Sequence, residues 1–416
     1  MKRITLFLSS FIFLLASCAP RATPTPAGPQ TLTVMTHDSF AVSEAVVKSF
    51  EQANNARIVF LKGGDAGAVL NKAILTKNAP LADLLYGVDN TFLSRSLDAD
   101  IFDAYASPEL KNIPAEFNLD ASNRALPVDY GDVCVNYDKA YFSEKNLAAP
   151  QTLEDLTKPE YKNLLVMENP ATSSTGLAFL LATIAHYGDG FTEYWRALKA
   201  NDVVVVDGWE TAYYTNFSAS SGKGPQPLVV SYGSSPAAEV VFAEKPLVDS
   251  PTASILGPDT CFRQIEFVGI LKGTQHRALA EKFADFMLSQ QFQEDMPLQM
   301  FVYPVNLNAA LPDAFVKYAQ AFVVLPGGFG TMDEVFEVLT LIQTKKITPV
   351  PVILVGSSFW SGLKDWIIRA MLEHENNVNQ EDMDLLTIMD DADEVVQYIN
   401  NFYAERGHQL IPNYTL

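Results

Sequence analysis

Segments of strand character and segments of helical character alternate near the start of this chain. The β-rich runs 31–36, 56–61 and 82–86 are separated by stretches 41–52 and 66–75, whose apolar residues recur at helical spacing. A β-α-β-α-β order of this kind favours a parallel sheet with helices on both faces. We therefore expect an α/β fold.

The same mixture of patterns continues beyond residue 120. Strand patterns and helical patterns alternate again, the strands at 125–137, 164–167, 203–206 and 227–232 and the helices at 175–187 and 278–290. We expect one domain over 31–314 with two lobes, lobe 1 from about 31–125 and 255–314 and lobe 2 from about 126–254. Two lobes of this kind commonly hold a ligand in the cleft between them.

The N-terminus carries the pattern of an export signal. Lys2 and Arg3 precede an apolar run at 4–15, which is too short for a stable membrane-spanning helix. The run ends in Leu-Ala-Ser-Cys at 15–18, which resembles the lipobox of bacterial lipoproteins. That resemblance implies a signal peptide over 1–18, a lipid on Cys18 and a location outside the cytoplasm. Prolines and small residues over 19–30 indicate a semi-rigid tether from the membrane to the folded domain.

Charge and cysteine content limit the partners and the chemistry of the chain. It has 29 basic and 49 acidic residues, a net charge of −20, which disfavours nucleic acid and favours cationic solutes. Outside the cytoplasm, Cys134 and Cys261 are free to oxidise, and we propose a disulfide between them. Two separately buried thiols are the alternative.

Seven short segments carry a resemblance to a known class of protein. They are 34–40 (VMTHDSF), 87–90 (GVDN), 127–131 (PVDYG), 169–176 (NPATSSTG), 208–213 (GWETAY), 231–236 (SYGSSP) and 303–306 (YPVN). In this order and spacing they resemble the thiamine-binding solute-binding proteins that serve ABC importers. The resemblance implies a two-lobed, type II periplasmic-binding-protein-like fold. It also implies a membrane permease as partner and thiamine, or a thiamine phosphate, as ligand.

The residue types in these segments suit that ligand. A desolvated quaternary cation is held best by aromatic faces and a carboxylate. Aromatic faces come from Tyr130, Trp209 and Tyr232, and the candidate carboxylates are Asp38, Asp65 and Asp129. The resemblance implies ligand contacts from Asp65, Ser173, Ser174, Trp209, Tyr232, Gly233, Ser234 and Ser235. The Thr-Ser-Ser run at 172–174 precedes an apolar helix and is predicted to cap it. Such a cap can bind a hydroxyl or a phosphate.

Other ligands remain open from the residues alone. The adjacent pair Tyr213 and Tyr214 resembles the way some related binding proteins hold ferric iron, and a polyamine would also suit an acidic, aromatic site. No His or Glu cluster with metal-ligand spacing accompanies the tyrosines, so no metal site is predicted. His37 stands alone in sequence and no catalytic motif is present. We expect a monomeric binding protein without a cofactor rather than an enzyme.

The chain changes character near residue 315. A strand pattern at 321–325 runs into Pro-Gly-Gly-Phe-Gly-Thr-Met-Asp-Glu at 326–334. After this loop come helices at 335–344, 360–373 and 392–404 and strands at 349–355 and 385–389. The motif resembles the LONELY GUY family, often called lysine decarboxylase-like, which releases a base from its ribose 5′-monophosphate. The resemblance covers about 315–405 and implies a Rossmann-like, doubly wound segment.

That resemblance also implies roles for individual residues. Gly327, Gly328, Gly330 and Thr331 would form a phosphate-binding loop, and Glu334 would act on the ribose side. From the residues alone, Thr331 and Glu334 also fit a capping box, three positions apart at a helix start.

The nucleotide site of that family is incomplete here. The family's own first βαβ unit should precede the segment, and this chain has Leu311-Pro312 where the family carries an Arg-Lys pair. We therefore expect residues 315–416 to be a partial, inactive segment with a vestigial loop. Phosphoribohydrolase activity is the alternative function. The stretch 315–320 would fit either the solute-binding family or the LONELY GUY family. A join through such a shared stretch indicates recombination or an error in gene assembly.

Overall fold

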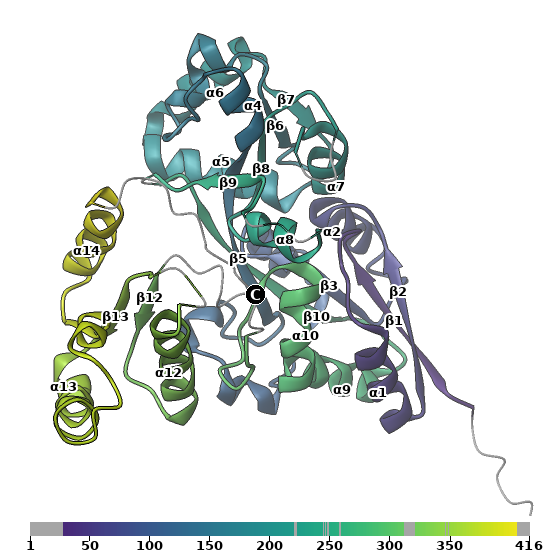
Figure 1. Cartoon of the computed structure of the whole chain (residues 1–416). Coiled ribbons are helices and arrows are strands. Elements are labelled where there is room, and N and C mark those ends of the chain that lie inside the picture. The colour runs from purple at the N-terminus through teal and green to yellow at the C-terminus, as the bar shows by residue number, and fades with distance from the viewer. Residues whose placement is uncertain are drawn as a thin grey trace, which may run out of the picture.

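Figure 1 shows the computed structural model of the 416-residue chain. The structure describes residues 28–405 except 220–222, 244, 246, 248, 258, 312–320, 346 and 348. The predicted signal peptide with Cys18, residues 19–27 of the predicted tether and the predicted junction at 315–320 lie outside the described residues.

One mixed sheet runs through the first three quarters of the described chain. Its order is β2-β1-β3-β10-β5-β8-β6-β7, with β4 beside β10 and both β9 and β11 beside β5. The strands are β1 Gln30–Thr36, β2 Ala56–Lys62, β3 Leu84–Asp89, β4 Phe102–Asp103, β5 Leu126–Asp138, β6 Leu165–Glu168, β7 Val204–Val206, β8 Leu228–Tyr232, β9 Thr252–Ile255, β10 Phe262–Leu271 and β11 Tyr303–Pro304. The predicted parallel pairing is confirmed for β1 with β2 and β3, whereas β10 runs antiparallel to β3 and β5.

Helices cover both faces of this sheet. They are α1 Glu44–Asn54, α2 Ala66–Leu75, α3 Leu93–Asp98, α4 Lys139–Glu144, α5 Ser174–Tyr187, α6 Phe191–Ala200, α7 Trp209–Thr211, α8 Ser235–Val241, α9 Arg277–Leu288 and α10 Gln290–Met300. Single 3₁₀ turns join them at Pro108–Asn112, Ala115–Phe117, Asp155–Thr157, Pro159–Tyr161 and Gly188–Gly190. In the described part of the chain, no helix combines the length and the apolar character needed to cross a membrane.

Two pairs of hydrophobic cores define the two lobes. In lobe 1, Val34 of β1 packs toward α1, α9 and α10, while the next residue, Met35, packs toward α2 on the opposite face. This follows from the alternation of side chains along a strand. In lobe 2, Met167 of β6 packs with α5 and α6, and its neighbour Val166 packs with Phe217 on the other face. The long strands β5 and β10 pass from one lobe to the other.

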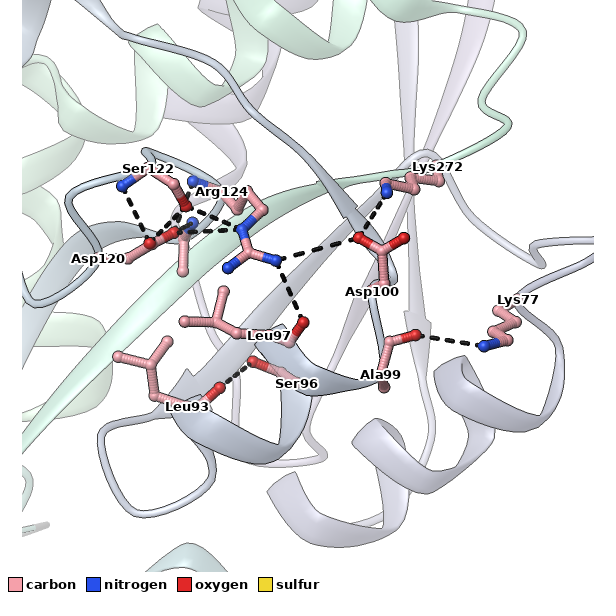
Figure 2. Close-up of polar contacts among 11 residues, drawn as sticks. Lys77, Leu93, Ser96, Leu97, Ala99, Asp100, Asp120, Ser122, Arg124 and Lys272 are labelled. Carbon is pink, nitrogen blue, oxygen red and sulfur yellow. Dashed lines mark hydrogen bonds and ion pairs between the residues drawn. The ribbon is translucent and has the colours of Figure 1, made fainter.

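Polar contacts hold the loop before β5 against α3 (Figure 2). Arg124 Nη1 donates to the carbonyl oxygen of Leu97 at 3.1 Å, and Lys77 Nζ donates to that of Ala99 at 3.3 Å. Cations are favoured at a helix C-terminus, where carbonyl oxygens lack partners within the helix. Asp100 lies within 4.0 Å of the Arg124 guanidinium and completes the cluster.

A disulfide joins the two long strands on the lobe 2 side. Cys134 lies in β5, and Cys261 directly precedes β10. Their Cα atoms are 4.4 Å apart. The structure therefore has the proposed bond rather than two separate thiols.

The C-terminal segment has a sheet and a core of its own. Three parallel strands lie in the order β12-β13-β14, with β12 at Phe322–Val324, β13 at Val352–Val355 and β14 at Thr387–Met389. Between and after them come α12 Phe329–Gln343, α13 Ser357–Trp366, a π-helical turn Ile367–His374, a 3₁₀ segment Gln380–Leu385 and α14 Ala392–Glu405. Trp360 is fully buried in this core. The strand, glycine loop and helix order predicted from the sequence is confirmed.

Candidate functional site

A cavity of 870 Å³ lies between the two lobes. Lobe 1 and the segment after α10 contribute His37, Ser39, Ala41, Asp65, Glu266, Gln299, Met300, Phe301 and Val302. Lobe 2 contributes Ser174, Thr175, Trp209, Glu210, Tyr213, Tyr214, Tyr232, Ser235, Ala238, Glu239, Phe242, Ala243, Leu247 and Pro251. The volume suits a small organic molecule.

Aromatic rings form the lobe 2 wall of the cavity. Trp209 begins α7, and the π-helical turn Ala212–Asn216 that follows places Tyr213 and Tyr214 beside it. The rings of Trp209 and Tyr213 stack at 5.0 Å and 16°, and Tyr214 meets the indole edge-on. The indole Nε1 donates to Ser231 Oγ at 2.9 Å, which fixes its orientation. Tyr232 lies 6.4 Å from Trp209, measured between ring centroids.

Carboxylates lie around this aromatic wall. Asp65, the N-cap of α2, accepts a hydrogen bond from the backbone N–H of Trp209 at 2.8 Å, so the contact crosses from lobe 1 to lobe 2. Glu239 of α8 accepts a hydrogen bond from the Tyr213 hydroxyl. Burial raises the pKa of Glu239, and the Tyr213 hydrogen bond partly opposes that rise. Aromatic faces beside carboxylates are the environment that holds an organic cation.

Three acidic residues lie side by side beneath the cavity. Glu266 of β10 is the register partner of Asp89 in β3 and of Asp129 in β5. Like charges directly opposite each other repel. Burial and the charge of Glu266 raise the pKa of Asp129 well above its usual range, and burial above all raises that of Asp89 to about 7. The Tyr86 hydroxyl lies between two of them, 2.6 Å from Asp129 Oδ2 and 3.1 Å from Glu266 Oε2.

His37 provides the positive charge for this acidic row. Its Nε2 atom lies 3.4 Å from Glu266 Oε1, and both side chains are buried. Burial alone would lower the pKa of His37, but the charge and hydrogen bonding of Glu266 outweigh it and the pKa is raised. For Glu266, burial would raise the pKa, but His37 brings it below the usual value. The interpretation of His37 as solitary is therefore wrong, because its partner comes from a distant strand.

Five residues predicted to contact the ligand line the cavity: Asp65, Ser174, Trp209, Tyr232 and Ser235. They come from the N-terminus of α2, the N-terminus of α5, α7, the end of β8 and the start of α8. Sequence segments that are far apart in the chain therefore meet at one site.

The other predicted contact residues lie outside the lining. Ser173 is the N-cap residue of α5, as predicted, but its hydroxyl is paired with Thr175 Oγ1 at 3.0 Å instead of capping the helix. The backbone N–H of Gly233 donates to Asp132 O at 2.7 Å, and Ser234 Oγ donates to Phe301 O at 2.6 Å. The contacts of Gly233 and Ser234 hold the loop that lies between the cavity residues Tyr232 and Ser235.

Asp38, Asp129 and Tyr130 also lie outside the lining. Asp38 Oδ1 accepts from the backbone N–H of Gly64 at 3.0 Å, and Asp129 is fully buried behind Glu266. The Tyr130 ring stacks between Phe117 and Tyr303 at 4.8 and 5.3 Å, with Arg263 over it.

Four charged residues of the cavity were not among the predicted contacts: His37, Glu210, Glu239 and Glu266. A β-bulge shifts the pairing of β10 with β5 between Glu266 and Phe267. Bulges re-aim side chains and break the alternation from which strands are recognised. His37 lies within 34–40, one of the seven segments that carry the family resemblance, and this was the one sequence signal that pointed to it.

The glycine loop of the C-terminal segment leads into α12. Gly328 is the N-cap of the helix, which begins at Phe329, and Thr331 therefore lies inside the first turn. The capping-box alternative places Thr331 at the N-cap and is wrong. A Cβ atom on Gly327 would collide with the Thr331 side chain, so the loop requires glycine at that position. Phe329 is 95% exposed.

Among the described residues, no group of three or more His, Cys, Asp or Glu side chains is arranged to hold a metal ion. Tyr213 and Tyr214, the adjacent pair that raised the ferric iron alternative, have ring planes at 87° to each other.

Comparisons with known proteins identify two regions. Residues 79–324 match the family described as bacterial extracellular solute-binding protein, and residues 311–399 match the family described as possible lysine decarboxylase. Both resemblances drawn from the sequence are thus confirmed at the level of family.

Individual relatives agree with the longer match. The thiamine-binding periplasmic protein of Salmonella typhimurium is 30% identical, over 76% of this chain and 92% of its own length. Its counterpart from Escherichia coli is 30% identical, over 71% of this chain and 86% of its own. The solved structure of a periplasmic thiamin binding protein superposes with a TM-score of 0.58 and 29% identity, covering 69% of this chain and 86% of that one. The chain belongs to the family of bacterial extracellular solute-binding proteins.

Proposed function

We propose that the protein captures thiamine, or a phosphate ester of thiamine, in the cavity between its lobes. The observation that carries the proposal is the stacked pair Trp209 and Tyr213 beside the carboxylate of Asp65. Thiamine combines a permanently cationic thiazolium with a flat aminopyrimidine. Aromatic faces attract the cation through their quadrupole, and a nearby carboxylate adds Coulombic attraction in a site that excludes water. Relatives named as thiamine-binding at 30% identity support the same ligand.

Within this proposal, the N-terminus of α5 receives the hydroxyethyl tail. Ser174 and Thr175 begin that helix and line the cavity. Backbone N–H groups at a helix N-terminus lack partners within the helix, which makes the position suitable for a hydroxyl or a phosphate oxygen. This arrangement would hold the thiazolium at the aromatic wall, with its tail toward α5.

Delivery to a membrane permease is the expected role of the loaded protein. Its relatives are periplasmic, and solute-binding proteins of ABC importers pass their ligand to such a partner. We propose that a lipid on Cys18 anchors the protein as a monomer outside the cytoplasm. Lobe closure on the ligand would create the form that the permease recognises.

A fluorescence titration tests the ligand. The chain from residue 19 to 416 is titrated with thiamine while tryptophan emission is followed, in parallel with Trp209→Ala and Trp366→Ala. Trp366 is a half-exposed residue of the C-terminal segment and serves as the control. We expect saturable quenching in the wild-type protein and in Trp366→Ala, and none in Trp209→Ala. A folded wild-type protein that does not respond to thiamine but does respond to ferric citrate would replace this proposal with an iron-binding one.

We also propose that the C-terminal segment does not release bases from nucleotides. The supporting observation is that its described sheet has three strands and begins at β12, directly before the glycine loop. The strand and loop that would supply the other half of a nucleotide site are replaced by the solute-binding domain. Free adenine should not form from adenosine monophosphate, in the wild-type protein or in Glu334→Ala. Base release that Glu334→Ala abolishes would establish an enzyme.

A further inference from the structure

One part of the cavity lining presents a hydrogen-bond donor and an acceptor side by side. His37 Nε2 and Glu266 Oε1 are 3.4 Å apart, and both residues line the cavity although each is more than nine-tenths buried. The distance is longer than that of a good hydrogen bond, so neither atom is fully satisfied by the other. Buried polar atoms of this kind call for a partner.

Neighbouring residues fix the orientation of His37. Its Nδ1 faces Ser39 Oγ at 3.2 Å, which leaves Nε2 directed toward Glu266. Gly87 has a φ of +94°, and a Cβ atom there would collide with the imidazole ring. The histidine therefore sits directly against the backbone of β3 with little freedom to rotate.

Glu266 is fixed from behind in the same way. Its Oε2 accepts the Tyr86 hydroxyl at 3.1 Å, so Oε1 is the oxygen that remains for the cavity. Asp129 lies next to it in β5 and takes the stronger of the two Tyr86 hydrogen bonds, at 2.6 Å. The pairing of β10 with β5 shifts register directly after Glu266, between this residue and Phe267.

The hydrogen-bonding groups of this pair indicate which part of a ligand it meets. The pair presents one hydrogen-bond donor beside one acceptor, whereas the stacked faces of Trp209 and Tyr213 favour a cation. The neutral heteroaromatic ring of thiamine therefore fits the His37 end, and the thiazolium fits the Trp209 end. On the ring, the exocyclic amino group is a donor, and the adjacent ring nitrogen is an acceptor. This edge of the ring therefore matches an acceptor, Glu266 Oε1, next to a donor, His37 Nε2.

Resting on the proposed function, we propose that Glu266 and His37 together recognise the aminopyrimidine edge of the ligand. Glu266 Oε1 accepts a hydrogen bond from the exocyclic amino group, and His37 Nε2–H donates to the neighbouring ring nitrogen. The pair is thus the specificity determinant that distinguishes an amino-substituted ring from its oxo analogue. The aromatic wall, by contrast, selects for the cation.

Oxythiamine tests this assignment because it keeps the thiazolium and the tail. It replaces the amino group with an oxo group and places a hydrogen on the adjacent ring nitrogen, so its edge has donor and acceptor exchanged. Affinities for thiamine and oxythiamine are measured by calorimetry for the wild-type chain, Glu266→Gln and the control Glu239→Gln. The control removes one cavity carboxylate by the same substitution, at the Tyr213 end.

The expected result is a change in the ratio of the two affinities. Wild-type protein should bind thiamine about 10- to 100-fold more tightly than oxythiamine, the effect of hydrogen bonds to charged groups. In Glu266→Gln the ratio should fall at least about 5-fold, because the new amide can donate to the oxo group. Glu239→Gln should weaken both ligands alike and keep the wild-type ratio, because both ligands carry the same cation.

The outcomes separate this inference from the proposed function. A folded wild-type protein that binds neither compound would overturn the thiamine proposal itself. Tight thiamine binding with equal affinity for oxythiamine would overturn only the assignment of Glu266 and His37, and this measurement needs no variant. An unchanged ratio in a folded Glu266→Gln variant would also overturn the assignment. Thermal melting of each variant checks that it is folded.

Discussion

The carboxylate of Asp65 in lobe 1 accepts the backbone N–H of Trp209 in lobe 2 at 2.8 Å. One turn further along α2, the backbone N–H of Ala68 donates to Thr172 O at 3.2 Å. Between them, Gly67 lies so close to lobe 2 that an added Cβ atom would be 2.8 Å from the Thr172 oxygen. The N-terminus of α2 is therefore one place where the lobes touch beside the cavity, as Ser234 and Phe301 are another. The structure has the lobes in a closed arrangement there.

Removing the Asp65 carboxylate should weaken ligand binding and favour separated lobes. We expect Asp65→Ala to lower thiamine affinity about 10-fold, the effect of losing a charge-assisted hydrogen bond. Calorimetry measures the affinity, and small-angle X-ray scattering measures the radius of gyration with thiamine present. Asp38→Ala is the matched control, because Asp38 accepts a hydrogen bond from Gly64 within the same lobe. Equal losses in the two variants would mean that the contact between the lobes is unimportant.

Adding a methyl group at Gly67 should block closure without touching the ligand directly. In Gly67→Ala the new Cβ atom meets Thr172 O and, at 2.9 Å, the Phe92 ring, so the lobes must stay apart or α2 must shift. We expect an affinity loss of about 10-fold or more with little change in melting temperature. Gly190→Ala is the control, since the nearest atom to its Cβ is 3.9 Å away. Wild-type affinity in Gly67→Ala would show that closure tolerates the methyl group.

The pKa of Asp89 makes the stability of the fold depend on pH. Burial raises this pKa to about 7, from about 3.9 in an unfolded chain, against hydrogen bonds from Thr91, Gln264 and the Phe92 N–H. The folded state therefore binds a proton that the unfolded state has lost, so the contribution of Asp89 to stability falls as pH rises from about 4 to about 7. Relative to Asp89→Asn, wild-type protein should lose roughly 2–3 kcal/mol of unfolding free energy between pH 5 and pH 8.

Urea unfolding of both proteins at the two pH values measures this difference. Ionisable groups that are distant from Asp89 and common to both proteins cancel in the comparison. If the difference in unfolding free energy between the two proteins were the same at both pH values, a raised pKa for Asp89 would be contradicted.

The bond between Cys134 and Cys261 should stabilise the fold more than it affects binding. It closes a loop with a sequence separation of 127, and removing such a link costs about 2–5 kcal/mol. We expect Cys134→Ser with Cys261→Ser to lower the melting temperature by several degrees. A Cβ on Gly233 would lie 3.4 Å from Cys134 Sγ, so the loop holding Tyr232 and Ser235 rests on the bond. Thiamine affinity should therefore fall only a few-fold. A melting temperature unchanged by the double substitution would refute this prediction.

The solute-binding domain should fold and bind without the C-terminal segment. The hydrophobic cores of the described residues are separate: those of the lobes end at Val305, and those of the segment begin at Phe322. A chain ending at Leu311 should therefore keep the wild-type thiamine affinity and the melting transition of the lobes. Calorimetric melting compares it with the full chain. Loss of binding in the shorter chain would mean that the segment supports the lobes.

Much of the fold could be predicted because local periodicity decided it. The strand at 30–36 and the helix at 66–75 lie within one residue of their predicted bounds, since each has one clear apolar pattern. Strand β10 was missed because all but its first two residues are buried, so it shows no alternation. The aromatic half of the site was predictable from Trp209 and Tyr232, which stand in recognisable motifs. The acidic half was not, because His37 meets Glu266 only through the order of the strands.

The two lobes share one continuous sheet, joined by strands β5 and β10. The lobes are therefore not joined by flexible linkers. Any increase in the angle between them must be taken up as twist or bend in two paired strands. The pairing of β10 with β5 is interrupted beside Glu266, and the disulfide joins the same two strands on the lobe 2 side. Closure on a ligand would therefore strain the part of β10 that carries Glu266, the residue proposed to recognise the ring. Amide hydrogen exchange along 262–271 should therefore differ between the free and the thiamine-bound protein.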